Sequence, residues 1–124
     1  MAGCGLGLGA ASTGIAWHVL AMYAPAAIIG AAGWRPPAAA TTYFGLALLT
    51  LGRVAASRQT IALGFDLALI IGGCGWSLTT LGATHWMHAR GEPPRSLLAL
   101  HDASLFAAAA CGAVAAGVGV LALR

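Results

Sequence analysis

The fold of this chain is decided by residues 67–89, which read LALIIGGCGWSLTTLGATHWMHA without one formally charged side chain. About 20 predominantly apolar residues are enough for a helix to cross the hydrocarbon core of a bilayer. Three further charge-free runs occupy residues 1–34, 36–52 and 103–123. The pattern predicts an all-α integral membrane protein with four transmembrane helices.

Composition supports the same fold class. Of the 124 residues, 60% are hydrophobic and 7% are charged, whereas a soluble domain carries about 25% charged residues. The net charge is +3, and its arginines stand singly between the apolar runs. This spacing is typical of interfacial anchors and does not form a nucleic-acid patch. We therefore expect the lipid bilayer as a partner, no nucleic acid, and a multi-pass location in the bacterial inner membrane.

The chain is expected to form one transmembrane domain, residues 1–124, with spans at about 10–32, 38–56, 61–84 and 97–122. Short links make neighbouring spans antiparallel and put both termini on one side of the membrane. The arginines do not indicate on which side of the membrane the termini lie. Three arginines are expected at each face, so the positive-inside rule favours neither orientation.

Small residues mark two candidate helix-packing faces. Residues of this kind, spaced about four apart, let helix backbones approach closely in a membrane. Glycine is also common in membrane helices generally, so each patch has an ordinary compositional explanation as well. The candidates are Gly72, Gly73 and Gly75 on the third span, and Ala109, Ala113 and Gly117 on the fourth.

Three histidines lie near one membrane face and raise the question of a metal site. His85, His88 and His101 have carboxylates nearby, and such a group could bind zinc or copper. The alternative is that they are polar residues in a wet interfacial segment, and we expect no bound ion and no cofactor. A haem held by His18 and His101 is disfavoured, because their depths differ by on the order of 10 Å.

The remaining polar positions are candidates for a substrate pathway or a gate. Ionisable side chains inside a membrane are expensive to bury and are functional candidates for that reason. Each of two candidates also has a purely structural explanation. His18 could be a neutral histidine that is hydrogen-bonded to a neighbouring helix. Asp102 could stabilise the start of the fourth helix through the helix dipole. No Ser-His-Asp order, phosphate loop or paired carboxylate indicates an enzyme. The candidates are His18, Asp66, Asp102, Arg35 and Arg90.

Two segments of the chain contain motifs that are similar to those of a known protein family. The first contains His18-Val19-Leu20-Ala21-Met22-Tyr23-Ala24-Pro25, followed by Gly30, Arg35 and Gly45. The second contains Gly73-Cys74-Gly75-Trp76, followed by Gly82-Ala83-Thr84 and then by His101-Asp102-Ala103. In order and spacing they resemble helices two to five of bacterial major facilitator superfamily permeases. There, the second helix reads roughly HVLxMxAPSFxTG and the fourth reads GxGWNxxxxGxT.

The resemblance, which covers about residue 15 to the C-terminus, carries expectations about fold and orientation. It implies that the four spans correspond to four consecutive helices of a twelve-helix transporter. It also implies that the links at 33–37 and 85–95 are cytoplasmic and that both termini face outward. Asp102 falls at the aspartate of an NDF-like triplet in that family.

The chain departs from the family pattern at three positions. Pro37 stands at a loop glycine, Ser77 replaces the asparagine after the tryptophan, and Asp66 replaces a bulky apolar residue. Counterparts of helix one, helix six and the second half are missing, although a complete facilitator binds its substrate between two halves. We therefore expect a transporter-like protein with an incomplete major-facilitator fold that works in a homo-oligomer or larger complex. The alternative is a small accessory or structural subunit of a membrane enzyme complex without transport activity.

Overall fold

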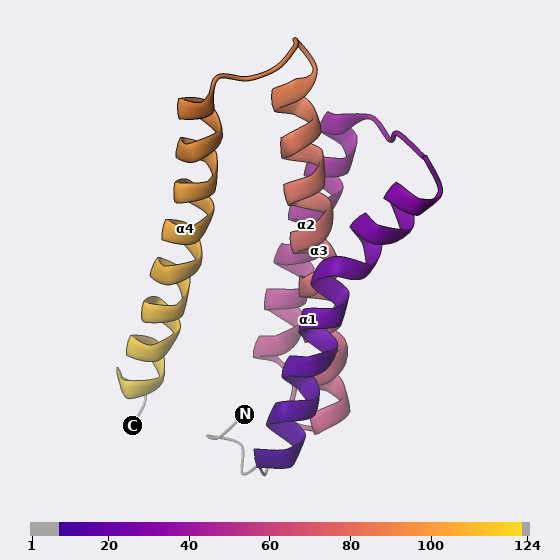
Figure 1. Ribbon diagram of the computed structural model, residues 1–124. Helices are drawn as coiled ribbons and strands as arrows, with labels where there is room; N and C mark the ends of the chain where they lie inside the picture. Colours follow the sequence, from indigo (N-terminus) through magenta and orange to yellow (C-terminus); the bar gives the residue numbers. More distant parts are fainter. Residues whose placement is uncertain (1–7, 123–124) are drawn as a thin grey trace. The chain divides into compact units, whose positions relative to one another are not determined.

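The computed structural model describes residues 8–122, which form four helices and, within that range, no strand (Figure 1). They are α1 (Leu8–Ala31), α2 (Ala38–Ser57), α3 (Ala62–His88) and α4 (Arg95–Ala122). Each contains a segment long and apolar enough to cross a membrane. The predicted all-α architecture with four membrane-spanning helices is confirmed.

The link between α1 and α2 has a clear local cause. Gly33 has a φ of 63°, and its N–H donates to the carbonyl of Gly30 at 3.1 Å, while the N–H of Trp34 donates to Ile29 at 3.2 Å. These two bonds form a Schellman motif, in which a left-handed glycine ends the helix. Because the following prolines lack a backbone N–H, they do not continue it.

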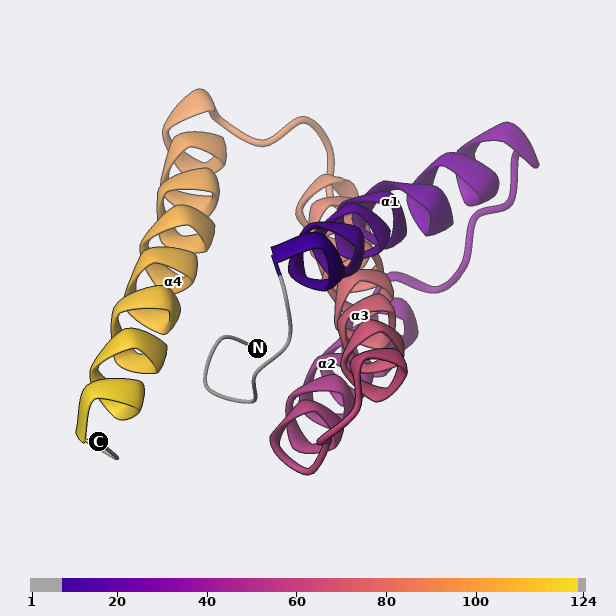
Figure 2. The ribbon, with the colours of Figure 1, turned by 90° about the horizontal axis from the view of Figure 1, so that it is seen from below.

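The chain divides into two compact units, residues up to Ala89 and residues from Arg90 onward. The first contains α1, α2 and α3, and both α1 and α2 pack against α3. Seen from below, α1 and α2 cover different faces of α3 (Figure 2). α1 runs in the same direction as α3, and α2 runs in the opposite direction (Figure 1). The second unit consists of α4 and the segment that precedes it.

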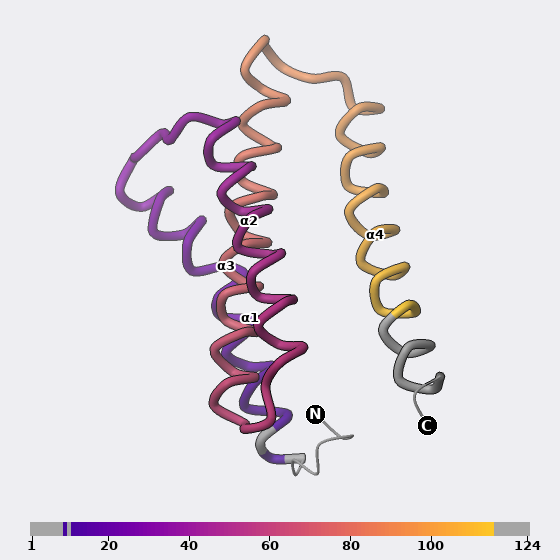
Figure 3. The backbone as a smooth tube through the Cα atoms, turned by 180° about the vertical axis from the view of Figure 1, so that it is seen from behind, coloured from indigo at the N-terminus to yellow at the C-terminus, as the bar shows by residue number. Residues whose placement is uncertain are grey.

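Glycines bring α2 and α3 into backbone contact along their length, as the view from behind shows (Figure 3). A Cβ atom built on Gly75 would lie 2.6 Å from the backbone nitrogen of Leu49 and 2.8 Å from the carbonyl oxygen of Gly45. One built on Gly52 would lie 2.8 Å from the backbone nitrogen of Gly72. Only residues without a side chain permit this spacing.

The opposite face of α3 receives α1. A Cβ on Gly73 would lie 2.6 Å from the carbonyl oxygen of His18 and 2.9 Å from the Cβ of Ala21. Farther along, α1 contains Pro25, and its second half bends away from α3 (Figure 1). A proline inside a helix removes one backbone hydrogen bond and its ring clashes with the preceding turn, which is the usual cause of such a bend.

Candidate functional site

His18 lies where α1 crosses α3 and is half-buried there. Its Nδ1 is 2.7 Å from the carbonyl oxygen of Leu69. Because a carbonyl oxygen accepts only, Nδ1 carries the proton and donates it, and in the neutral ring Nε2 is then an acceptor. The contact ties the two helices together through a polar group inside the span and orients the imidazole.

Ser77 provides the second polar contact between these helices. Its side chain is 1% exposed, and its Oγ accepts a hydrogen bond from the backbone N–H of Ala26 at 3.2 Å. Ala26 directly follows Pro25, so the hydroxyl supplies an acceptor at the bend, as neighbouring Ser and Thr side chains do in membrane helices. Sequence reasoning noted Ser77 only as a departure from a family motif. A proline inside the first span was the signal that a nearby hydroxyl would be needed.

Asp66 lies one turn into α3 with one oxygen out of contact with water. Its Oδ1 is buried and has no hydrogen-bond partner among the described residues. Asp66 precedes Gly73 by seven residues, so both lie on the face of α3 that receives α1. Arg53 and Arg58, the basic residues nearest in sequence, are exposed. The carboxylate is therefore the least compensated polar group described in the three-helix unit.

Arg35 and His85, fifty positions apart, line one cavity of about 280 Å³ at the end of the three-helix unit. The bent end of α1 and its Schellman turn supply one wall, and α3 supplies the other. The remaining lining residues are Ala26, Ile29, Gly30, Gly33, Trp34 and Leu81.

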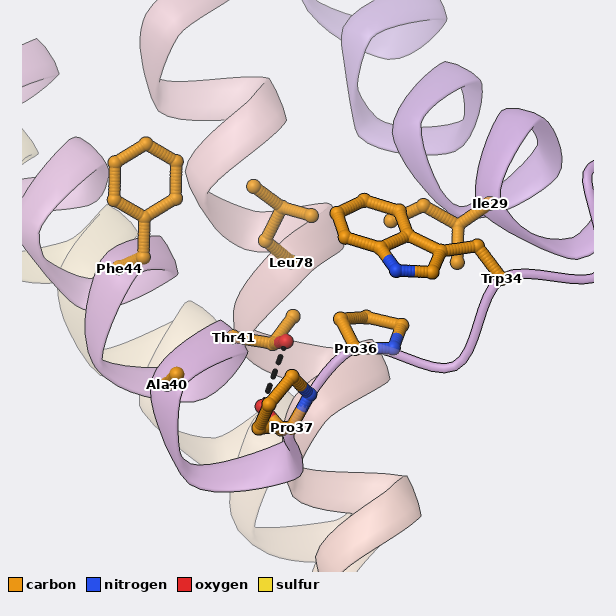
Figure 4. Close-up of a pocket in the computed structure, with 8 residues that line it drawn as sticks. All are labelled: Ile29, Trp34, Pro36, Pro37, Ala40, Thr41, Phe44 and Leu78. Atoms are coloured by element: carbon orange, nitrogen blue, oxygen red, sulfur yellow. Dashed lines mark hydrogen bonds between the residues drawn. The ribbon is translucent and has the colours of Figure 1, made fainter.

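A second, apolar cavity of about 330 Å³ adjoins the same tryptophan (Figure 4). The hydroxyl of Thr41 donates to the carbonyl of Pro37 at 2.9 Å, so the one side-chain hydroxyl in its lining is already engaged. The lining consists of Ile29, Trp34, Pro36, Pro37, Ala40, Thr41, Phe44 and Leu78.

The other histidines are not gathered into a metal centre in the part of the chain that the structure describes. α3 continues to His88, one turn beyond the expected end of the span. There, His88 lies with Nδ1 2.9 Å from the carbonyl oxygen of Thr84 on its own helix and is exposed. His101 and Arg90 belong to the second unit.

Asp102 does not stabilise the start of α4 in the way expected from the sequence. The helix begins at Arg95 and has no acidic residue in its first turn, because it starts directly after two prolines, with the N–H of Leu97 bonded to Pro94. Asp102 is then about two turns inside the helix and exposed. The helix dipole has little effect beyond the first turn.

The two candidate packing faces differ in the structure. Gly73 faces α1 and Gly75 faces α2, whereas a Cβ on Gly72 would meet nothing within 4 Å. On α4, Ala109 and Ala113 are exposed. The surroundings of Gly117 lie outside the described residues.

Comparison with known proteins finds sequence similarity to a transporter. No protein-family model matches the chain, and no solved structure matches it. The chain is 35% identical over 126 residues to the riboflavin transporter RfnT of Brucella anthropi, an alignment that covers 94% of this chain and 30% of the transporter. The chain thus spans less than a third of the length of that relative. The predicted partial resemblance to a larger transporter is confirmed, and the chain is a transporter-like integral membrane protein.

Proposed function

We propose that this chain takes part in moving a small solute across the bacterial inner membrane and does so in a homo-oligomer or together with further membrane helices. The observation that carries the proposal is the identity to a riboflavin transporter along nearly the whole chain. A facilitator-type transporter holds its substrate between two helical halves. Four spans supply part of such a site, so other helices complete it.

Riboflavin, or a solute with a similar flat heteroaromatic ring and polyol chain, is the substrate class we propose. The ring offers imide and carbonyl groups, and the chain offers hydroxyls, so a site for it needs a few oriented donors and acceptors in an apolar setting. His18, oriented by Leu69, and Asp66, with its unpartnered Oδ1, are groups of this kind inside the spans. Arg35 and Arg90 are proposed gate residues at the helix ends.

The proposal is tested by measuring uptake of labelled riboflavin into proteoliposomes. We expect uptake from the assembled form, and loss of most of it in His18→Leu, which removes a half-buried hydrogen bond between α1 and α3 worth about 1 kcal/mol. Thr50→Val is the matched control, because the Thr50 hydroxyl bonds only within its own helix at an exposed position. Absence of riboflavin binding and uptake in every assembly state would refute the substrate. Uptake by a clean monomer would refute the need for partners.

The second candidate function is an accessory subunit of a membrane enzyme complex that carries no solute. It is favoured by α4, since this apolar helix is the one described helix of its own unit, and an apolar helix surface suits packing against a larger protein. Affinity purification of a tagged copy from mildly solubilised membranes distinguishes the two. A stoichiometric membrane enzyme favours the accessory role, and self-association alone argues against it.

A further inference from the structure

Two cavities of different character lie beside Trp34. One contains the cationic Arg35 and the imidazole of His85, and the other is lined by prolines and by Phe44 and Leu78 (Figure 4). Ile29 and Trp34 line both. A polar compartment with positive charge therefore directly adjoins an apolar one.

The position of the two cavities follows from the path of the backbone. α1 bends in the half that contains Pro25, so its last turns leave the surface of α3 (Figure 1), and residues of these turns line both cavities. Gly33 then reverses the chain in a left-handed turn, which brings Trp34 and Arg35 back toward α3. The prolines that follow form the floor of the apolar cavity.

The chemistry of the lining selects for an anion. A guanidinium pairs with phosphate through two parallel hydrogen bonds, and an imidazole can add a third donor. None of the described residues that line the two cavities is acidic. Tryptophan and arginine beside a helix end are typical of the membrane–water interface, where lipid phosphates lie.

We propose that the two cavities together form one site that binds an anionic phospholipid. Its phosphate lies in the cavity of Arg35 and His85, and part of an acyl chain lies in the cavity between Trp34 and Phe44. A free phosphate would fill the polar cavity alone, whereas a lipid accounts for both cavities and for their position at the end of two membrane-spanning helices.

The test uses native mass spectrometry of the full chain in mild detergent, with phosphatidylglycerol, phosphatidylcholine and inorganic phosphate as separate probes. We expect the anionic lipid to bind about tenfold more tightly than the zwitterionic one, because both carry the phosphate but only the choline headgroup brings a positive charge that Arg35 repels. Arg35→Gln should remove this preference. Arg53→Gln is the matched control, since Arg53 is exposed near the other end of α2, and it should keep the preference.

A second variant tests whether the apolar cavity contributes to lipid binding. Phe44→Ser should weaken both lipids by a similar factor without changing their ratio, because Phe44 lines only the apolar compartment. Equal binding of the two lipids to the wild type would overturn the proposal, as would an unchanged preference in Arg35→Gln. Binding of inorganic phosphate that neither lipid displaces would show an anion site without a lipid role. The readout is lipid binding, so it is independent of whether the chain moves riboflavin.

Discussion

α3 and α4 have similar compositions but very different surroundings. Both are long, apolar and rich in small residues. In α3, the backbones of two neighbouring helices come close to Gly73 and Gly75, whereas a Cβ on Gly112 of α4 would meet nothing within 4 Å in its own unit. The difference teaches that a small residue permits close helix packing, and that the surroundings decide whether the position tolerates a side chain.

The largest expected effect comes from filling the contact between α2 and α3. Gly75→Leu should destabilise the three-helix unit by about 3 kcal/mol, because the obstructing atoms are backbone atoms of α2 that cannot rotate away. SDS-induced unfolding in mixed micelles, followed by tryptophan fluorescence, measures it. Gly112→Leu is the control and should change stability by less than about 0.5 kcal/mol. If both variants changed the free energy of unfolding equally, close packing around the glycine would not distinguish α3 from α4.

Neighbouring glycines on α3 sharpen the comparison within one helix. Gly73→Ala should cost about 1–3 kcal/mol through overpacking against α1, whereas Gly72→Ala should be neutral or slightly stabilising, because alanine favours the helix and its Cβ meets open space. The same unfolding measurement applies to both. A larger loss in Gly72→Ala than in Gly73→Ala would mean that α3 is rotated relative to the described structure.

The hydroxyl at the bend of α1 should have a moderate effect. Ser77→Ala leaves the N–H of Ala26 without this acceptor and should cost about 1–2 kcal/mol. In a Pro25→Ala background, the helix can recover its own hydrogen bonds, so the same substitution should cost clearly less. A double-mutant cycle measures this coupling. Strict additivity would show that the serine and the bend are independent.

The smallest expected change has the opposite sign. Asp66→Leu removes a buried oxygen that has no partner among residues 8–122 and should stabilise the unit by about 1 kcal/mol, since unpaired buried polar groups are costly. Asp102→Leu, at an exposed position of α4, should change stability by less than about 0.5 kcal/mol. If Asp66→Leu were instead destabilising, the carboxylate would have a partner outside the described residues.

The sequence by itself determined the number and nature of the helices and the place where α1 ends. Burial of charge in lipid is so costly that the spacing of nine charged residues suffices to predict four spans. Glycine and proline identify the link after α1, because a left-handed turn and a missing N–H are local properties of those residues. α3 ends later and α4 starts earlier than the sequence predicts. The reason is that interfacial histidine and arginine fit equally well inside a helix or beside it.

Only the tertiary structure decided which residues meet. Whether Gly72, Gly73 or Gly75 touches a neighbour depends on the rotation of α3 about its axis, and a helix that is apolar on all sides carries little hydrophobic pattern to set that rotation. The hydrogen bond between Ser77 and Ala26 and the cavity that Arg35 and His85 both line depend on that rotation and on the bend of α1. In both pairs the two residues lie about fifty positions apart, so no local pattern in the sequence brings them together.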